Sequence, residues 1–345
     1  MARTLKVAVA GLGPVGLAVA RAVLQVPALK LVAAADPSPL HAGRDLGVVL
    51  GLPRKLRVKV EGRPERFFKK VRADVAFVCT SSFLKETKPQ LAALIGHRVN
   101  VLTTCEELVH PAPARAAAWK ELDKLAKRKK VSLLATGVNP GFAMDTLALA
   151  LTAPCATVRR VSVTRVVDAA ARKLALQRRV GAGLNLAQFR RAVTEGTVRH
   201  VGLLESAHLV AAALGWKLDR LDETLEPAIA PRDLDTQELR ISAGAAAGIR
   251  QSVRGYRGGE LAISLDLQVY VGAESPRDHV LVDGDPPVDA TIAGGINGET
   301  ATAAMLVNSL PRLLAAPAGV VSVRDLPLVH ALNPQDLSLP FPRKR

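Results

Sequence analysis

Aromatic residues, cysteines and long apolar runs are all scarce in this chain of 345 residues. Aromatics make up 3% of it, too few to supply the stacking platforms that bind single-stranded nucleic acid. The three cysteines, Cys79, Cys105 and Cys155, lie far apart and include no Cys-x-x-Cys pair. We therefore expect no metal site and no disulfide framework, and a reducing cytoplasm suits the chain. No apolar run approaches the roughly 20 residues that cross a membrane, and the first strand begins too early for a secretory signal.

Acidic residues are also few relative to basic ones. Lysine and arginine number 47 against 31 aspartates and glutamates, which gives a formal net charge of +16. Such a charge can mark a nucleic-acid surface, or it can reflect ordinary basic helices. The basic residues are scattered in twos and threes, so we predict no nucleic-acid partner. The length is sufficient for two domains with sizeable cores.

The N-terminal segment has the clearest pattern. An apolar run at 7–10 predicts a buried strand, followed by Gly11-Leu12-Gly13-Pro14-Val15-Gly16, a helix, and a second strand at 31–35. In this context Gly11 permits a tight turn, Gly13 lets the backbone approach a pyrophosphate, and Gly16 lets the helix pack on the strand. The helix N-terminus suits a diphosphate. The pattern predicts dinucleotide binding, and the alternative is a glycine turn in an α/β protein without a cofactor.

Asp36 ends the second strand, about twenty residues beyond the turn, where an acid hydrogen-bonds a ribose 2′-OH. Its charge would repel a 2′-phosphate, which favours NAD. Arg44 and other nearby bases leave NADP open.

Strands and helices alternate as far as residue 136, which predicts a doubly wound parallel sheet. After a break at 137–145 the pattern becomes α+β, and apolar and polar residues alternate over 261–271 as in a half-buried antiparallel strand. We predict an α/β protein with an N-terminal Rossmann domain over 1–140 and an α+β domain with an open mixed sheet over 141–298. Further strands are expected at 75–80, 100–104, 131–136, 158–168 and 238–243, and helices at 85–96, 112–130, 146–151, 186–195, 202–214 and 300–314.

Polar residues follow the ends of two of the predicted strands, at the edge where open α/β sheets bind ligands. Thr80, Ser81 and Ser82 would contact a cofactor there or cap the next helix. Glu106 and Glu107 offer a carboxylate that could take a proton from an amine or a water and return it. Burial would raise the pKa of such a group toward neutrality. The alternative is a pair of first-turn helix acids that complement the dipole. Glu106, which comes first off the strand, is the better candidate to face a ligand.

Other polar residues give weaker signals. Asn139 could orient a substrate or a nicotinamide carboxamide, or it could be a turn residue that tolerates unusual φ. Asp168 lies between Arg165 and Arg172 and is expected to form a structural ion pair. The histidines show no metal-ligand spacing, and no histidine partner for Cys105 is evident, so a cysteine nucleophile is not predicted.

Longer motifs run through nearly the whole chain: GLGPVG at 11–16, GRDLG at 43–47, TTCEEL at 103–108, GVNPGFAMD at 137–145, GAGL at 181–184, RQ at 250–251 with RG at 254–255, YVGA at 270–273 and GETATAA at 298–304. Together they resemble the 2,4-diaminopentanoate dehydrogenases and related native amine dehydrogenases of the dihydrodipicolinate reductase-like superfamily. CEEL and GVNPGF are the most specific. The E-x-H-H and K-x-x-x-S-G-T segments of true dihydrodipicolinate reductases are absent, which argues against the lysine-pathway reaction.

The resemblance implies NAD(P)-dependent oxidative deamination of a primary amine, reversible as reductive amination of a ketone or aldehyde with ammonia. It maps the family's activating glutamate onto Glu106, with Glu107 as the second choice. It also implies a homodimer whose last segment, 299–345, packs back on the first domain. Relatives often carry His-Gly-Asp where this chain has Asn297-Gly298-Glu299, which leaves the preferred amine open.

The predicted catalytic residues are thus Glu106 and Glu107. The predicted cofactor-binding residues are Gly11, Gly13, Pro14, Val15, Gly16, Asp36, Thr80, Ser81, Ser82, Thr104, Cys105 and Asn139. The predicted substrate pocket comprises Phe142, Ala143, Met144, Asp168, Leu184 and Asn297. Three rival functions remain: 2,4-diaminopentanoate dehydrogenase proper, an imine reductase that needs no ammonia, and a non-enzymatic NAD(P)-sensing or nucleic-acid-binding protein.

Overall fold

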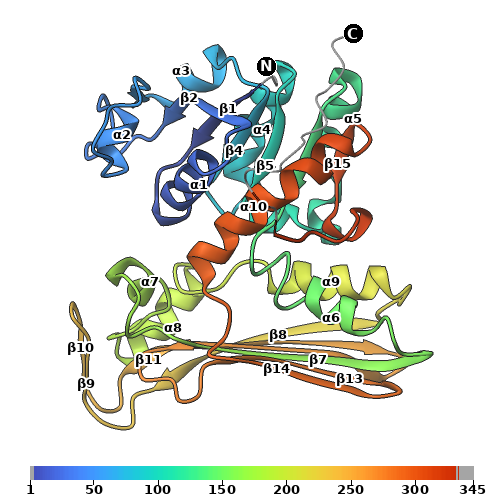
Figure 1. Cartoon of the computed structure of the whole chain (residues 1–345). Helices are drawn as coiled ribbons and strands as arrows, with labels where there is room; N and C mark the ends of the chain where they lie inside the picture. Colours follow the sequence, from blue (N-terminus) through green and yellow to red (C-terminus); the bar gives the residue numbers. More distant parts are fainter. Residues whose placement is uncertain (1–3, 332, 334–345) are drawn as a thin grey trace. The chain divides into compact units, whose positions relative to one another are not determined.

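The computed structural model describes residues 4–331 and residue 333, and the chain divides into two compact units. Unit 1 contains the residues up to Gly141 together with those from Asn297, and unit 2 is Phe142–Ile296 (Figure 1). The chain passes between the units at 141–142 and 296–297, where the sequence predicted boundaries at 140 and 298. Among the described residues, no helix is both long and apolar enough to span a bilayer.

A parallel sheet of seven strands forms the centre of unit 1, in the order β15-β6-β5-β4-β1-β2-β3. The strands are β1 Leu5–Ala10, β2 Leu29–Ala35, β3 Val60–Glu61, β4 Val75–Val78, β5 Asn100–Thr103, β6 Ser132–Ala135 and β15 Gly319–Val321. The central strands are short apolar runs buried along their length, as helices on both faces require. The order reverses at β1, so the carboxyl ends of β1 and β4 flank the switch point where such sheets bind ligands. The predicted doubly wound domain is confirmed.

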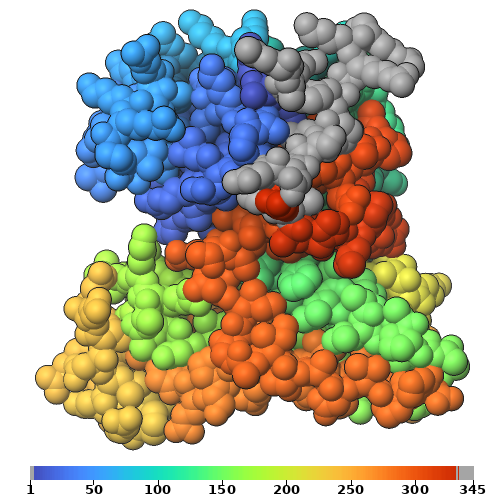
Figure 2. Space-filling view, in the orientation of Figure 1, coloured from blue at the N-terminus to red at the C-terminus, as the bar shows by residue number. Residues whose placement is uncertain are grey.

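The helices of unit 1 are α1 Pro14–Leu24, α2 Leu46–Val49, α3 Pro64–Lys70, α4 Leu84–Gly96, α5 Ala116–Lys129 and α10 Gly298–Ala315, with 3₁₀ turns η1 Glu106–Leu108, η2 Pro113–Arg115 and η3 Val323–Asp325. The helix expected over 112–130 begins at Ala116, because η2 occupies its first turn. Helix α10 packs on α1, and Figure 2 shows its orange-red surface beside the blue N-terminal residues of the same unit. Of the segment 299–345 that was predicted to pack here, residues 332 and 334–345 lie outside the described part.

Unit 2 is built on a mixed sheet of six strands in the order β14-β13-β7-β12-β11-β8. Strands β7 and β12 run parallel and the other neighbours antiparallel. The strands are β7 Thr157–Asp168, β8 Arg220–Ile229, β11 Ala246–Arg257, β12 Glu260–Tyr270, β13 Arg277–Asp285 and β14 Val288–Ala293. Four helices lie on one face of this sheet (Figure 1), namely α6 Thr146–Leu151, α7 Leu174–Arg179, α8 Leu186–Thr194 and α9 Leu203–Ala213. The predicted open mixed sheet is confirmed.

The sequence analysis missed four strands of this sheet, β8, β11, β13 and β14. Each carries charged side chains on its exposed positions, and each is recognisable only from its pairing partners. The strand expected over 238–243 was wrong in extent: only β10 Arg240–Ile241 pairs, in a small hairpin with β9 Leu234–Asp235.

Candidate active site

The glycine turn after β1 contains two glycines that the fold requires and one that it does not. Gly11 has a φ of 82°, and a methyl group on it would lie 2.4 Å from the carbonyl oxygen of Cys79. A methyl group on Gly16 would lie 1.8 Å from the carbonyl oxygen of Gly11. At Gly13, by contrast, a methyl group would meet nothing within 4 Å. Open space beside Gly13 is what an approaching pyrophosphate needs.

Helix α1 begins directly after Gly13, with Pro14 and Val15 as its first residues, and no side chain of the described chain caps its N-terminus. The first N–H groups of a helix have no partner within it. Together with the positive end of the helix dipole, they form a ready anion site at the open side of Gly13. The residues present therefore fit a dinucleotide.

Asp36, at the end of β2, braces the glycine turn. Its Oδ2 accepts a hydrogen bond of 2.6 Å from the N–H of Leu12, and its Oδ1 accepts one of 2.9 Å from the N–H of Ser38. The Nδ1 atom of His41 lies 3.3 Å from Oδ1. Each carboxylate oxygen has a second lone pair, so Asp36 retains the capacity to accept a ribose hydroxyl.

Two of the three hydroxyl residues after β4, Thr80 and Ser81, make local contacts with α4 or with the residue that precedes it. Thr80 Oγ1 donates to Gln90 Oε1 at 2.7 Å, and Ser81 Oγ donates to Glu86 Oε2 at 2.5 Å while it accepts from the N–H of Phe83 at 3.1 Å. Of the two roles considered from sequence, organisation of the helix start is thus directly visible for Ser81. Contact with a cofactor remains a prediction.

Glu106 and Glu107 lie in turn η1, directly beyond the carboxyl end of β5, but their surroundings differ. Glu107 is buried, its Oε2 accepts from the N–H of Leu84 at 2.8 Å, and its Oε1 pairs with the guanidinium of Arg115. Glu106 is half-buried, with its Oε2 atom shielded from solvent. Glu107 thus has both oxygens committed to structural contacts. The assignment of proton exchange to Glu106 remains a prediction.

Thr104 and Cys105 connect β5 to this turn. The N–H of Thr104 donates to the carbonyl oxygen of Val78, which ties the turn to β4. Burial raises the pKa of the Cys105 thiol to about 12. The thiol is therefore protonated at neutral pH and a poor nucleophile, as the sequence led us to expect.

The segment after β6 is anchored to α10 within unit 1. The N–H of Val138 donates to Thr302 Oγ1 at 3.1 Å, and Asn139 follows as a half-buried residue. Asn297 caps the helix itself, since its Oδ1 accepts from the N–H groups of Glu299 and Thr300. The exposed Asn297 therefore has a clear structural role, and its predicted substrate contact remains a prediction.

Comparisons with known proteins agree on one family. The 2,4-diaminopentanoate dehydrogenase C-terminal domain family matches residues 142–338. A 2,4-diaminopentanoate dehydrogenase of Acetoanaerobium sticklandii is 30% identical over 334 residues, which cover 95% of this chain and 94% of that protein. The chain belongs to the 2,4-diaminopentanoate dehydrogenase family. An amine dehydrogenase of Streptomyces virginiae is 24% identical over 94% of this chain and 96% of its own. The structure of an amine dehydrogenase from Mycobacterium smegmatis has the same fold, with a TM-score of 0.86, 24% identity, and coverage of 96% of this chain and 98% of that one.

The residues of unit 2 that were predicted to line the substrate pocket differ from one another in burial. Ala143 and Met144 are fully buried, as core residues would be, whereas Phe142 and Leu184 are half-buried. Asp168 accepts hydrogen bonds from the N–H groups of Ala170 and Gly272, at 2.9 and 3.0 Å. It therefore fixes the loop after β7.

The ion pair expected at Asp168 was wrong, because Arg165 pairs with Asp278 instead. Arg165 Nη1 lies 2.6 Å from Asp278 Oδ1, and both side chains are buried. Strands β7 and β13 place these two residues directly opposite each other. Such a pairing is invisible in sequence, because 113 residues separate the partners.

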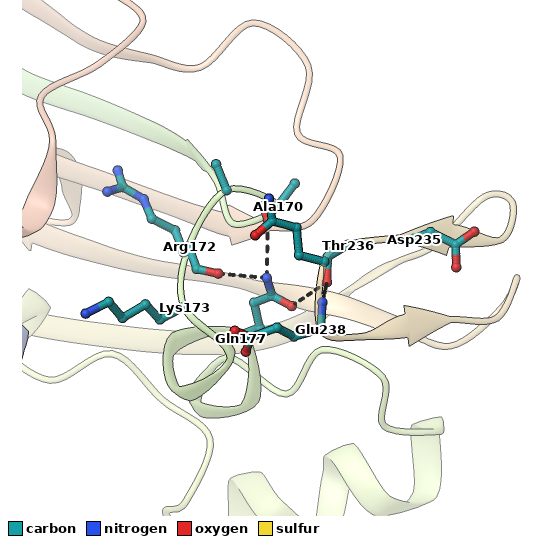
Figure 3. A pocket seen from close by; sticks show the side chains of 9 residues that line it. Ala170, Arg172, Lys173, Gln177, Asp235, Thr236 and Glu238 are labelled. Atoms are coloured by element: carbon teal, nitrogen blue, oxygen red, sulfur yellow. Dashed lines mark hydrogen bonds between the residues drawn. The ribbon is translucent and has the colours of Figure 1, made fainter. Parts of the chain in front are cut away.

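A hollow of about 470 Å³ in unit 2 lies between the loop after β7 and the β9–β10 hairpin (Figure 3). Gln177 lies between these two walls, where its Nε2 donates to the carbonyl oxygens of Ala170 and Arg172 and its Oε1 accepts from Thr236. The charged side chains at the rim do not converge: in Figure 3, Arg172 extends to one side and Asp235 to the other. We therefore do not assign this hollow to the substrate.

Two structural roles of acidic side chains escaped the sequence analysis. Glu107 caps α4 from a position 23 residues beyond Leu84, and no sequence signal announces such a distant cap. Asp145, fully buried, caps α6 and accepts a hydrogen bond of 2.7 Å from Ser206 Oγ. An acid directly before a helix is a standard N-cap signal, so this second role was within reach of the sequence.

Proposed function

We propose that the chain catalyses the NAD(P)-dependent oxidative deamination of a primary amine, and the reverse reductive amination of a ketone or aldehyde with ammonia. Membership of the 2,4-diaminopentanoate dehydrogenase family supports the reaction class. The observation that carries the proposal is the position of Glu106, at the carboxyl edge of a Rossmann sheet whose glycine turn fits a dinucleotide. A carboxylate at that edge is the proton-transfer group that amine chemistry requires.

NAD is the favoured cofactor, since Asp36 places a negative charge at the end of β2. The open side of Gly13 and the uncapped start of α1 would hold the diphosphate, and Asp36 would accept the ribose hydroxyl. The nicotinamide, when bound, exchanges a hydride with the amine carbon of the substrate. Residues of this chain supply binding, orientation and proton transfer.

Glu106 accepts a proton from the substrate ammonium, which frees the nitrogen lone pair needed for loss of hydride. After Glu106 has released this proton to solvent, its carboxylate takes a proton from the water molecule that attacks the iminium carbon and returns it to the nitrogen. Ammonia then leaves as the carbinolamine hydroxyl gives its proton to solvent and becomes the carbonyl group. In the reverse direction Glu106 assists loss of hydroxide from the carbinolamine. Each step needs one carboxyl group that both gives and takes a proton.

The decisive assay is NADH and NADPH oxidation with a panel of small ketones and aldehydes, with and without ammonium. Ammonium-dependent oxidation supports the proposal, whereas oxidation without ammonium points to an imine or carbonyl reductase. Glu106→Gln should retain NADH binding and lose at least 10²-fold in kcat, as expected when a general base is removed. A fully active Glu106→Gln enzyme would remove Glu106 from the mechanism.

We also propose a cytoplasmic homodimer. The helices of unit 2 cover one face of the six-stranded sheet (Figure 1). In β11 and β12, the positions that alternate with the buried ones carry polar side chains such as Arg254 and Asp266, which pair at 2.6 Å. A sheet face on which no helix of the described residues lies suits a second copy of the chain. The three cysteines are free thiols, which agrees with a reducing compartment. Light scattering of the purified protein tests the dimer, and a monomer at micromolar concentration would contradict it.

A further inference from the structure

The turn that bears Glu106 is tied on both sides to the start of α4. Before it, Cys105 Sγ lies 3.1 Å from Thr87 Oγ1. After it, the N–H of Glu107 donates to the carbonyl oxygen of Ser82 at 3.2 Å. The position of Glu106 is thus set by its two sequence neighbours, and both neighbours are held by the segment that follows β4.

The side chain of Glu107 also contacts the start of α4. Helix α4 has Phe83 at its N-cap, a residue without an oxygen or nitrogen in its side chain, so the helix cannot cap itself. Glu107 Oε2 supplies the missing acceptor, at 2.8 Å from the N–H of Leu84. Its Oε1 is paired with Arg115, which compensates the charge of the buried carboxylate. A carboxylate at a helix N-terminus is also favoured by the dipole.

Residues 80–82 lie between β4 and the start of α4, next to the turn that bears Glu106. They leave the carboxyl end of β4, which flanks the switch point of the sheet, and Ser82 is the residue whose carbonyl accepts from Glu107. A dinucleotide that contacts residues 80–82 would therefore act on the same short segment that Glu107 binds.

We propose that Glu107, which is held in an ion pair with Arg115, is a positioning residue. It couples the binding of the cofactor at residues 80–82 to the position of the Glu106 side chain. The inference rests on the proposed function, in which Glu106 exchanges the proton. It gives the second acid of the CEEL motif a role distinct from catalysis: Glu107 orients the turn and caps α4, and takes no proton from the substrate.

Hydrogen–deuterium exchange with and without NADH tests this coupling without using activity. In the wild-type enzyme, NADH should slow exchange in residues 80–84 and also in residues 105–109. In Glu107→Ala, NADH should still protect 80–84, with a dissociation constant within about threefold of wild type, but protection of 105–109 should be lost. Glu107→Gln keeps an amide oxygen that can accept from the N–H of Leu84, so NADH should partially protect residues 105–109 in this variant. It replaces the alanine variant in the experiment if Glu107→Ala folds poorly.

Glu121→Gln is the matched control, because Glu121 of α5 pairs with Lys88 of α4 and makes no contact with the turn in the described structure. It should exchange like wild type. In steady-state assays, Glu107→Ala should lower kcat at least tenfold with an unchanged KM for NADH, and Glu107→Gln should retain more than a tenth of wild-type kcat.

Three results would overturn the coupling. They are equal protection of both segments in Glu107→Ala, no protection of 105–109 in wild type, and a Glu107→Gln variant as inactive as Glu106→Gln, which would make Glu107 the base. Failure of the proposed function is a separate result. An active Glu106→Gln enzyme would show that Glu106 is not the base, whereas the exchange experiment would still measure whether NADH binding at residues 80–84 protects residues 105–109.

Discussion

Asp36 Oδ2 accepts a 2.6 Å hydrogen bond from the N–H of Leu12, and this contact joins the acid proposed to bind the cofactor ribose to the turn proposed to hold the diphosphate. Substitution can separate the observed contact with Leu12 from the proposed contact with the ribose. Asp36→Asn retains an oxygen for Leu12 but loses the negative charge. We expect NADH affinity to fall and NADPH affinity to rise, so that the ratio of dissociation constants shifts by about tenfold, or about 1.4 kcal/mol. Fluorescence titration of both cofactors measures the shift. An unchanged ratio would mean that Asp36 only braces the turn.

Two glycines of the turn, Gly13 and Gly11, predict opposite outcomes for substitution by alanine. Gly13→Ala adds a methyl group that meets nothing within 4 Å in the folded chain, at a φ of −63° that alanine adopts freely. Its free energy of unfolding should stay within about 1 kcal/mol of wild type, while NADH affinity falls because the methyl group occupies the approach to the backbone. Gly11→Ala, at a φ of 82° and 2.4 Å from a carbonyl oxygen, should instead lose stability by more than about 1 kcal/mol.

Gly96→Ala is the control for both, since a methyl group at this position also meets nothing within 4 Å and the residue ends α4, away from the turn. It should leave both stability and NADH affinity near wild type. Urea unfolding and NADH titration of the three variants provide the comparison. Normal NADH affinity in Gly13→Ala would contradict diphosphate binding at this turn.

Local patterns sufficed to predict the central strands of unit 1, because a parallel sheet buried on both faces requires apolar runs and the glycine turn has a fixed spacing. The short strands β3 and β15 and helix α3 were not predicted. The strands of unit 2 were harder: β13 carries Asp278, a buried charge that reads as a loop residue until Arg165 is placed opposite it. The same limit applies to the candidate site. Position after a strand pointed to Glu106 and Glu107, but only the fold shows that Leu84 and Arg115 engage Glu107.

The Arg165–Asp278 pair should be important for the stability of unit 2. Besides each other, the two side chains bind Ile296, whose N–H donates to Asp278 Oδ2 at 2.8 Å and whose carbonyl oxygen accepts from Arg165 Nη2 at 2.5 Å. Removal of one partner leaves an uncompensated buried charge, so Arg165→Met should cost about 3–5 kcal/mol in the free energy of unfolding.

The pair of Arg159 and Asp283 joins the same two strands but is exposed, with 61% and 37% of the side-chain surfaces accessible. Arg159→Met should therefore cost no more than about 1 kcal/mol. Urea denaturation measures the free energy of unfolding of both variants. An equal decrease in the two variants would show that burial does not determine how much each ion pair contributes to stability.

Stability should also fall in acid because of His200. Burial, and then the positive charges of Arg179, Arg165 and Arg199, lower the pKa of His200 to about 3. Gln251 holds the residue in this setting, since its Oε1 accepts from the N–H of His200 and its Nε2 donates to the carbonyl oxygen, each at 2.9 Å. In the unfolded chain His200 takes up a proton near its ordinary pKa of about 6.5, whereas the folded protein resists protonation down to about pH 3.

The unfolded state therefore binds more protons between these two values, and the free energy of unfolding should decrease as the pH falls through this window. One proton contributes a slope of about 1.4 kcal/mol per pH unit. His200→Asn should reduce the measured slope by about this amount, whereas His97→Asn, which removes an exposed histidine of unit 1, should change it far less. Urea unfolding at several pH values between 4.5 and 6.5 measures both slopes. If His200→Asn left the slope unchanged, protonation of His200 would not be the source of the acid sensitivity.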